Sequence, residues 1–504
     1  MDRSIRLKSD GGGETLRVAL TALMLASAFS LVFYTCNTPL GAWIGSDNAM
    51  YLTMGTALAK GYAPYSEIFD HKGPLLFLLQ MLPQLPTDGY STLAVFVQEA
   101  LFLWACLLAI ARTARRLGVK TVVLQMIYLA LYAPLADGGN LTEEYANLFT
   151  LIGLDMMLGV FGEGLSKAQE KTLFAPALGM GALTTLAFMT RANNALVLVG
   201  AVGALAAWMT AARRWQGLGR CALGFVIGCA AVTAPIACWL YAHGALADAV
   251  YGSLLHNLMY AETQGQSRVH TLLFTAYGHY ALFLAALSCL GAACAAVRTR
   301  RYPLTLAMIA GAACGGFAGF ISHKFYNHYL MLCVPMATLG AAQALALIRE
   351  RMARRLRRVS RAAAALSALA LLVLGVQVNA QRERDYAVMQ ALVPDAQALY
   401  AQVPEADRDR FLAYRVEPKW YVAAEALPCM RFYFLQEILA AADPAVMDEI
   451  VAAFETEPPL WVVLFYNRSF SPPYDARVQE ILDTRYAFVD ARGEYQLLRL
   501  KEAP

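Results

Sequence analysis

The amino-acid sequence predicts an all-α polytopic membrane protein with about 11 transmembrane helices, followed by a small C-terminal extracytoplasmic α/β domain. Two features indicate the membrane: 58% of the 504 residues are hydrophobic and only 15% are charged, and the mean hydropathy is +0.45. An average soluble domain has about 25% charged residues. The third feature is a change after residue 380, where charged residues become frequent and apolar runs shorten. We therefore expect a transmembrane domain over 1–380 and a separate domain over 381–504.

Eleven segments are candidates to cross the membrane, which requires about 20 predominantly apolar residues. They lie near 17–37, 91–111, 121–136, 145–162, 172–190, 194–212, 221–242, 271–297, 303–321, 327–347 and 362–380. The third of them is short. The stretch 74–86 is interrupted by Pro83 and Pro86 and is too short to span, so we expect a re-entrant or interfacial piece there.

The distribution of Lys and Arg predicts how the chain crosses the membrane. With the N-terminus placed inside, 23 of these residues up to position 380 fall on the inner side and 5 on the outer side. Inner loops of membrane proteins carry the excess of positive charge. We therefore expect a protein of the cytoplasmic membrane with its N-terminus inside. Because the number of spans is odd, the C-terminal domain is expected outside.

The region after residue 380 mixes short strand and helix patterns, which is typical of a small α/β domain. We expect a buried strand at 460–465 and a hairpin of 486–489 with 495–498 that turns at Gly493. Helices are expected near 388–402, 433–456 and 475–484. The region contains no phosphate-binding loop and no Gly-rich dinucleotide fingerprint. The sequence therefore assigns it no chemistry.

The first external loop, 38–90, gathers acidic and basic side chains beside the membrane. Ser46 as N-cap and Gly61 as terminator predict a short helix from about Asp47 to Lys60. The apolar residues on one face of this helix are Met50, Tyr51, Met54 and Leu58. A helix with such a face is expected to lie in the membrane interface.

A second, irregular piece of the same loop is bounded by Pro64 and Pro74. It carries Asp70, His71 and Lys72 in succession. A loop that only joined two spans would not need these charges at the membrane surface. The alternative is a solvated loop whose Lys reaches toward the interface and whose acids are there by chance.

Three further polar clusters fall on the same outer side. Glu143, Glu144 and Tyr145 begin the fourth span, where either acid has the alternative role of stabilising the positive end of the helix dipole. Arg191 opposes the positive-inside bias and is therefore expected to have an anionic partner. The segment 323–329 holds the cations and aromatic residues His323, Lys324, Tyr326 and His328, which equally suit an interfacial anchor belt.

Carboxylates beside Lys and Arg at an interface suit a ligand that has a phosphate head group and a hydroxyl to be deprotonated. Lys and Arg hold phosphate through charge-assisted hydrogen bonds, and a carboxylate can act as a general base toward a hydroxyl. We therefore expect an amphipathic ligand with its phosphate at the interface and its tail among the membrane lipids.

At Asp47 and at Phe69-Asp70-His71-Lys72-Gly73-Pro74 the sequence resembles the GT-C superfamily of membrane glycosyltransferases. The resemblance is to the branch of the protein O-mannosyltransferases (glycosyltransferase family 39) and the lipid A aminoarabinose transferases. These enzymes have an acidic residue just after the first span, and many bacterial members follow it with an Asp-His-Lys-Pro-Pro-like segment. Two departures stand out: the usual acidic pair is Asp47-Asn48 here, and Gly73 replaces the first proline.

The resemblance implies transfer of a sugar from a polyprenyl-phosphate donor to a lipid, glycan or protein acceptor at the outer face. Asp47 matches the family's catalytic acid, and Lys72 matches the lysine that binds the donor phosphate. The other candidate catalytic carboxylates are Asp70 and Glu143, and the other candidate phosphate ligands are Arg191 and Lys324. The candidate supporting residues are His71, Glu144, Tyr145, His323, Tyr326 and His328.

A divalent metal ion is a secondary alternative. Asp70, His71, Glu143 and His323 offer suitable ligand atoms, but their spacing is not diagnostic. No cofactor and no nucleic-acid partner is otherwise indicated by the sequence.

A transporter or flippase of lipid-linked sugar would also be polytopic. It should show internal repeats and ionisable residues near mid-membrane, whereas the central parts of the predicted spans are almost wholly apolar. The arrangement of charges does not distinguish a glycosyltransferase from a phosphotransferase that acts on the same lipid carrier. The test there is whether free polyprenyl phosphate is released as the sugar is transferred.

Overall fold

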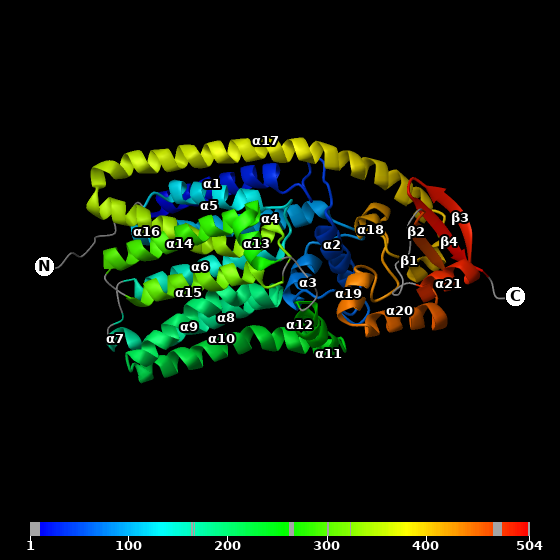
Figure 1. The fold of residues 1–504 in the computed structure, drawn as a ribbon, viewed down its shortest axis with the longest axis horizontal. Coiled ribbons are helices and arrows are strands. Elements are labelled where there is room, and N and C mark those ends of the chain that lie inside the picture. Colours follow the sequence, from blue (N-terminus) through cyan, green and yellow to red (C-terminus); the bar gives the residue numbers. More distant parts are fainter. Residues whose placement is uncertain are drawn as a thin grey trace.

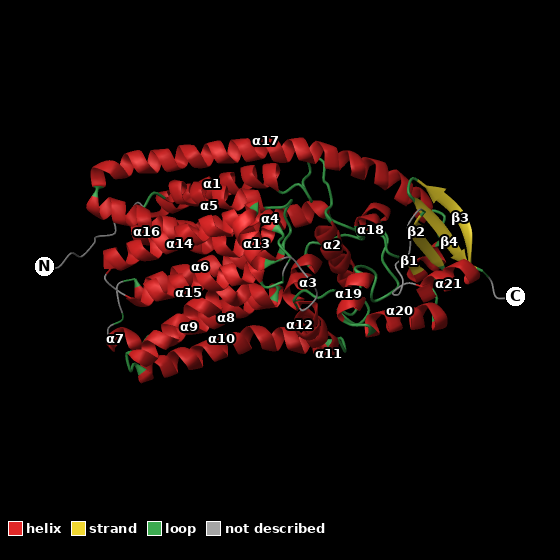
Figure 2. Ribbon diagram, in the orientation of Figure 1, coloured by secondary structure: helices red, strands yellow, loops and turns green. Residues whose placement is uncertain are grey.

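The structure is a computed structural model that describes residues 11–162, 165, 167–261, 267–299, 302–322, 324–466 and 476–501. A long helical bundle forms one end of the molecule, and a small domain that contains the strands forms the other (Figure 1, Figure 2). A single helix, α17 (Ala353–Tyr400), runs along one side of the bundle and continues into the small domain.

Nine helical segments among the described residues are long and apolar enough to cross a membrane, so the chain is an integral membrane protein. The helices are α1 (Gly11–Phe33), α4 (Thr92–Leu117), α6 (Thr142–Phe161), α9 (Leu196–Ala211), α10 (Trp215–Ala242), α14 (Ala276–Thr299), α15 (Tyr302–Phe320), α16 (Val334–Arg351) and α17. Two shorter apolar helices, α5 (Thr121–Tyr132) and α8 (Phe174–Thr190), occupy the two remaining predicted spans. The predicted polytopic helical fold is confirmed.

Three predicted spans differ in detail from the observed helices. The eighth is divided at Thr275, whose extended backbone separates α13 (Arg268–Phe274) from α14. The tenth begins with a 3-10 segment (Asn327–Cys333) before α16. The last is part of α17, so the expected domain boundary at 380 falls inside a continuous helix.

Several short helices lie at the junction between the bundle and the small domain (Figure 1). They are α2 (Ser46–Ala59), α3 (Pro74–Met81), α11 (Leu246–Val250) and α12 (His256–Ala261), with a π-helical turn (Tyr251–Leu255) between the last two. At the other end of the bundle lies α7 (Lys167–Glu170). Single turns of 3-10 helix extend α5 (Ala133–Leu135) and precede α9 (Ala192–Ala195).

The C-terminal domain has a four-stranded sheet in the order β1-β2-β4-β3. Its strands are β1 (Phe411–Ala413), β2 (Trp461–Phe465), β3 (Tyr486–Arg492) and β4 (Tyr495–Leu500). Its helical segments are a 3-10 turn (Glu405–Arg410), α18 (Lys419–Ala424), α19 (Gln436–Ala442), α20 (Ala445–Thr456) and α21 (Ala476–Arg485). β1 is parallel to β2, and the other pairs are antiparallel. The predicted strand and hairpin are confirmed, and β1 is an addition.

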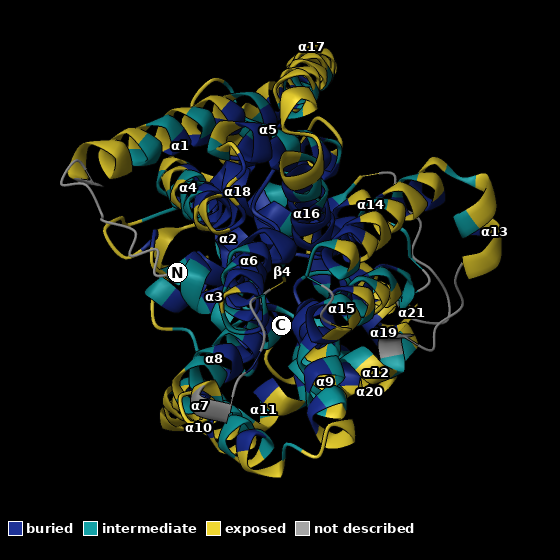
Figure 3. Ribbon diagram, turned by 90° about the vertical axis from the view of Figure 1, so that its left-hand side faces the viewer, coloured by how far each residue is buried: buried dark blue, intermediate teal, exposed yellow. Residues whose placement is uncertain are grey.

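Two hydrophobic cores hold the molecule together. One lies within the bundle, where the buried residues gather at the centre and the outer faces of α1, α10 and α17 are exposed (Figure 3). The other joins α2 and α3 to the sheet and helices of the C-terminal domain. The first external loop therefore shares its core with the C-terminal domain.

The prediction that α2 presents a single apolar face, as a helix lying on the membrane would, is wrong. Residues 48–58 are buried on every side of the helix. The reason is that α3 covers one side of α2 and α18 of the C-terminal domain covers another. Both the apolar residues of α2 and those between them are therefore covered by protein.

Candidate active site

The residues Asp70, His71 and Lys72 form a compact charged cluster, although all three are at least 94% buried. His71 Nδ1 lies 2.9 Å from Asp70 Oδ1, and Lys72 Nζ lies 3.6 Å from Asp70 Oδ2. The same Nζ is 3.2 Å from His71 Nε2. This geometry suits an imidazole that carries its proton on Nδ1, because Nε2 is then free to accept a hydrogen bond from the Lys72 ammonium.

Backbone hydrogen bonds fix this cluster to the rest of the bundle. The Tyr65 hydroxyl donates to the Lys72 carbonyl at 2.7 Å, and the Asn257 amide donates to the His71 carbonyl at 2.7 Å. The Gly73 N–H donates to the Thr190 carbonyl at 3.0 Å. A Cβ at position 73 would lie 2.1 Å from the Met189 carbonyl oxygen, which explains why this chain has glycine there.

Burial and neighbouring charge set the protonation of the cluster. Burial alone would raise the pKa of Asp70, but the charge of Lys72 and the contact with His71 outweigh it and hold the pKa well below its ordinary value. Burial, followed by the charge of Lys72, lowers the pKa of His71 to about 4. At neutral pH the cluster therefore holds an ionised Asp70 beside a neutral imidazole.

Arg191 has the anionic partner that the sequence predicts for it. Arg191 Nη1 donates to Glu143 Oε1 at 3.3 Å, and Nη2 donates to the Tyr329 hydroxyl at 3.1 Å. The guanidinium also lies over the Tyr329 ring, 4.6 Å from its centroid. Burial opposes the charged form of Arg191, but Tyr329 and Glu143 outweigh it and raise its pKa. Arg191 thus stays charged although its side chain is only 11% exposed.

Tyr51 of α2 lies where these groups converge. Lys72 Nζ is 5.6 Å from the centroid of its ring. Burial raises the pKa of Tyr51, and the charges of Asp47, Asp70, Glu143 and Arg191 also act on it. Tyr51 therefore lies beside Lys72 and is influenced by the charges of candidate residues from three separate loops. The sequence pattern predicts it only as part of an apolar face.

Asp47, in the first turn of α2, differs from Asp70 and Glu143 because it has no ion pair with any residue that the structure describes. Its side chain is half-buried, and among the described residues none forms a hydrogen bond or salt bridge with its carboxylate. Asp70 and Glu143 each face a cation, so Asp47 is the carboxylate of this cluster that is available to accept a proton.

Both cations retain hydrogen-bond donors for a ligand. Lys72 has three N–H groups and contacts two protein acceptors, and Arg191 has five N–H groups and uses two in the bonds given above. The cluster can therefore bind an anionic group with several oxygens while it leaves a carboxylate free for acid–base work.

The remaining predicted site residues make other contacts. Glu144 accepts a hydrogen bond from the Leu141 N–H at 3.3 Å, in agreement with the capping alternative, and another from the Tyr132 hydroxyl. His328 Nδ1 is 3.1 Å from Asp137 Oδ2, and Tyr326 stacks on the His328 ring. Lys324 is half-buried in the same segment, and His323 lies outside the described residues.

A buried amide network beneath Asp47 was missed by sequence reasoning. Asn48 Oδ1 accepts from Asn37 at 3.0 Å and from Asn140 at 2.5 Å. Asn140 and Gln80 exchange hydrogen bonds, and Tyr145 donates to Asn140 at 2.8 Å. Asn37 also donates to Glu99 of α4 at 3.1 Å. The only signal in the sequence is Asn48 itself. It stands where the glycosyltransferases that the sequence resembles usually have a second acid, and here it anchors the first turn of α2.

The expectation that the central parts of the spans are almost wholly apolar is too strong. Asp155 lies near the middle of its predicted span and is 2% exposed, and Arg116 and Arg112 contact its two oxygens at 2.9 and 3.3 Å. Glu99 is likewise buried in α4. In the part of the chain that the structure describes, no three His, Cys, Asp or Glu side chains are grouped to hold a metal ion.

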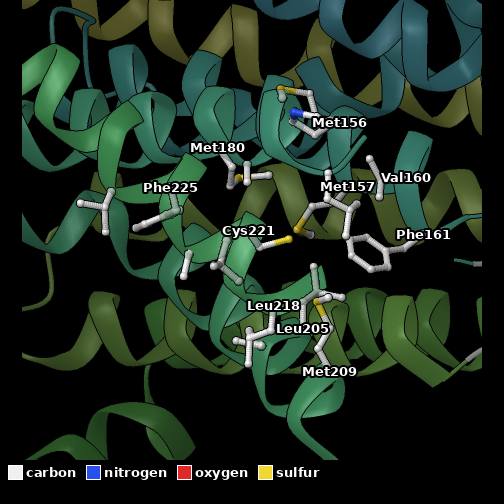
Figure 4. A pocket seen from close by; sticks show the side chains of 17 residues that line it. Met156, Met157, Val160, Phe161, Met180, Leu205, Met209, Leu218, Cys221 and Phe225 are labelled. Atoms are coloured by element: carbon white, nitrogen blue, oxygen red, sulfur yellow. The ribbon is translucent and has the colours of Figure 1, made fainter. Parts of the chain in front are cut away.

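An apolar cavity of about 270 Å³ lies among α6, α8, α9 and α10 (Figure 4). Its walls include Met157, Phe161, Met180, Cys221 and Phe225. The residues that α6 contributes, such as Met157 and Phe161, come from its C-terminal part, whereas Glu143 is at its N-terminus. The cavity is therefore separate from the charged cluster and offers it no polar group.

A sequence family described as "Putative competence-induced protein Ccs4 N-terminal domain" matches residues 14–376. The chain belongs to this family. The match covers the transmembrane helices, the first external loop and the charged cluster. Among curated proteins, none matches the chain.

The fold of this Ccs4-family chain is similar to that of ArnT from Cupriavidus metallidurans. The crystal structure of ArnT bound to undecaprenyl phosphate superposes with a TM-score of 0.63 at 15% identity, covering 95% of this chain and 98% of ArnT. The apo structure gives 0.62 at 14% identity, with the same coverage. ArnT is an aminoarabinose transferase of the GT-C superfamily. The predicted GT-C fold, including the C-terminal domain, is therefore confirmed.

Proposed function

We propose that this protein is a glycosyltransferase that moves a sugar from a polyprenyl-phosphate donor to an acceptor hydroxyl outside the cytoplasmic membrane. The observation that carries the proposal is the combination near Tyr51: the buried Lys72 and the largely buried Arg191, both with spare donors, and the carboxylate of Asp47, which has no ion pair among the residues that the structure describes. The fold that the chain shares with ArnT, which binds undecaprenyl phosphate, supports the class of donor.

In this proposal the acceptor oxygen attacks the anomeric carbon of the sugar while Asp47 takes the acceptor's proton. The bond between the anomeric carbon and the phosphate oxygen breaks, and its electron pair leaves with the polyprenyl phosphate. Lys72 and Arg191 stabilise the charge that grows on the phosphate oxygens. A single displacement of this kind inverts the configuration at the anomeric carbon. Asp70 and Glu143 hold the two cations in place.

The proposed orientation follows from the excess of Lys and Arg in the predicted inner loops. It places the N-terminus inside, and the charged cluster and the C-terminal domain outside. The donor's phosphate then lies at the outer interface and its tail in lipid. We propose that the acceptor is a lipid, a glycan or a protein of the cell envelope.

The test is an in-vitro transfer assay with purified protein, a small panel of radiolabelled polyprenyl-phosphate sugars and a membrane extract as acceptor. Wild type is compared with Asp47→Asn, which removes the base with little change of volume. We expect transfer by wild type, with release of polyprenyl phosphate, and a rate roughly 100 to 10,000 times lower for the variant.

Three other outcomes would change the assignment. Undiminished transfer by Asp47→Asn would move the role of base to Asp70 or Glu143. Transfer of the phosphate together with the sugar would identify a phosphotransferase. If folded wild type transfers no sugar but moves labelled donor across vesicles, the flippase alternative replaces the enzyme, and the buried acids Glu99 and Asp155 become its candidate residues.

A further inference from the structure

The segment that carries the charged cluster is held between two parts of the molecule. Three of its backbone bonds, at His71, Lys72 and Gly73, are made within the transmembrane domain and its first loop. A fourth comes from the C-terminal domain, because the Phe69 N–H donates to the Arg431 carbonyl at 3.0 Å. Phe69 directly precedes Asp70, so this bond fixes the start of the cluster.

The Phe69 side chain is anchored at the same place. It is 3% exposed, and its ring centroid lies 4.9 Å from that of Phe432 in the C-terminal domain. On its other side it packs against His256 of α12 and Tyr251 of the π-helical turn, with centroids 5.8 and 6.2 Å away. Arg431 covers the ring, with its guanidinium carbon 5.4 Å from the centroid.

The Arg431 side chain also links the two domains through ion pairs. Nη2 contacts Asp248 of α11 at 3.0 Å, and Nη1 contacts Glu449 of α20 at 3.2 Å. Next to this bridge, the Tyr251 hydroxyl donates to Asp443 of the C-terminal domain. One residue therefore joins the cluster segment, the segment α11–α12 and the C-terminal domain.

The C-terminal domain also fixes the helix that carries Asp47. The Tyr433 hydroxyl donates to the Met50 carbonyl at 3.3 Å, and Ser46 donates to Glu417 at 3.3 Å. Both halves of the charged cluster are thus supported from the same side. An irregular loop has no helical or sheet ladder to fix its geometry, so a binding site built on it depends on such supporting contacts.

We propose that the C-terminal domain is an integral part of the phosphate site, and that Arg431 is the positioning residue that holds Phe69 and, through it, Asp70, His71 and Lys72. The inference rests on the proposed function, because it assigns phosphate binding to Lys72. It gives a role to a domain for which the sequence suggested none. Without the Arg431 side chain, the main-chain bond to Phe69 remains, but the segment loses the two ion pairs and the ring contact that hold Phe69 and, through it, the position of Lys72.

The experiment uses full-length protein in detergent and two probes, farnesyl phosphate and farnesol, which share a tail and differ in the phosphate. Binding is measured for wild type, Arg431→Ala, Arg431→Lys and Asp248→Asn, together with hydrogen exchange of the amides in 66–72. The matched control is Arg477→Ala, because Arg477, like Arg431, bridges two carboxylates, but both of them, Glu455 and Glu480, lie in the C-terminal domain and away from the loop.

We expect Arg431→Ala to bind farnesyl phosphate at least roughly tenfold more weakly, with farnesol binding unchanged and exchange in 66–72 faster. Arg431→Lys should recover part of the affinity, because it keeps the charge but reaches one carboxylate only. Asp248→Asn, in which Glu449 still holds Arg431, should give a smaller change in the same direction. Arg477→Ala should match wild type in both measurements.

Wild-type affinity and wild-type exchange in a folded Arg431→Ala protein would overturn the positioning role. Equal losses in Arg431→Ala and Arg477→Ala would also overturn it, because they would indicate general loosening of the C-terminal domain. If wild type bound farnesyl phosphate no better than farnesol, the phosphate site itself would be overturned. The exchange data would still decide whether Arg431 holds the loop.

Discussion

Asp47 and Asp70 are two aspartates of the same external loop with opposite surroundings. Asp70 is 2% exposed and faces both His71 and Lys72, and its pKa is held below the ordinary value. Asp47 is half-buried and has no ion pair among the described residues. The comparison indicates two roles for a carboxylate in this loop. One that is paired with a cation holds the site together, and one without an ion pair can accept a proton.

The largest expected effect is on stability when the Asp70–Lys72 pair is broken. Lys72→Met or Asp70→Asn should each lower the free energy of unfolding by about 3–5 kcal/mol, because each leaves a buried charge without its partner. The double variant should lose less than the sum of the two. The free energy of unfolding is measured in mixed micelles for the two single variants and the double variant. Lys60→Met, at an exposed position, is the control. Additive losses would contradict the pairing.

The same double variant separates structure from function. It should recover much of the stability of the pair but should not recover binding of farnesyl phosphate, because the phosphate ligand Lys72 is absent. Phosphate binding by the stabilised double variant would move the phosphate site to Arg191.

The next effect is a pH dependence that arises from His71. Its pKa is about 4 in the folded protein and 6.5 in an ordinary setting, so the unfolded chain binds a proton that the folded chain excludes. His71 therefore contributes stability that is fully present above pH 6.5 and is lost as the pH falls toward 4, by roughly 3 kcal/mol in all. His71→Gln should remove this part of the dependence. Unfolding midpoints between pH 7 and pH 4.5 provide the measurement, and identical slopes for both proteins would refute it.

A smaller effect is expected at the other ion pair. Glu143→Gln should destabilise the protein by about 1–3 kcal/mol, less than the loss of Asp70, because Tyr329 still accepts from Arg191 and covers its guanidinium. Binding of farnesyl phosphate should change by only a few-fold. A loss as large as that of Lys72→Met would show that Glu143 does more than hold Arg191, and Arg191→Gln is the comparison for that case.

The smallest stability effect belongs to Asp47, whose replacement should abolish transfer most completely. Asp47→Asn should change the free energy of unfolding by no more than about 0.5 kcal/mol, because the carboxylate has no hydrogen-bond or ion-pair partner to lose in the described part of the chain. Parallel measurement of unfolding and of transfer for Asp47→Asn and Asp70→Asn tests the comparison directly. The contrast between the two aspartates is contradicted if Asp47→Asn lowers the free energy of unfolding as much as Asp70→Asn does.

The elements that were predictable from sequence are those whose signal is local. Apolar runs predicted the nine long apolar helices and the two shorter ones of the described residues, and alternation around Gly493 predicted the hairpin. The positive-inside rule predicted that Arg191 would have an anionic partner, but it did not identify Glu143 as that partner. β1 was missed because Phe411–Ala413 is a three-residue strand, defined by its parallel partner Trp461–Val463.

What was not predictable depends on contacts between segments far apart in the chain. From the sequence, Tyr51 is one residue of an apolar stripe, because the residues next to it in the chain do not indicate that the C-terminal domain covers α2. The network of Asn48, Asn140 and Glu99 joins three segments across more than 90 residues of sequence. Gly73 looked like a mild departure until the close approach of Met189 gave the reason.

The helix α17 has a consequence for how the membrane acts on this protein. Its 48 residues make a rod roughly 70 Å long, which is more than twice the thickness of a hydrocarbon core. The rod is continuous from the bundle to the C-terminal domain, where it packs against α18 and β3. Long spans respond to a thin bilayer by tilting. Because α17 is continuous with the C-terminal domain, we expect a tilt of its membrane part to displace the domain that supports Phe69.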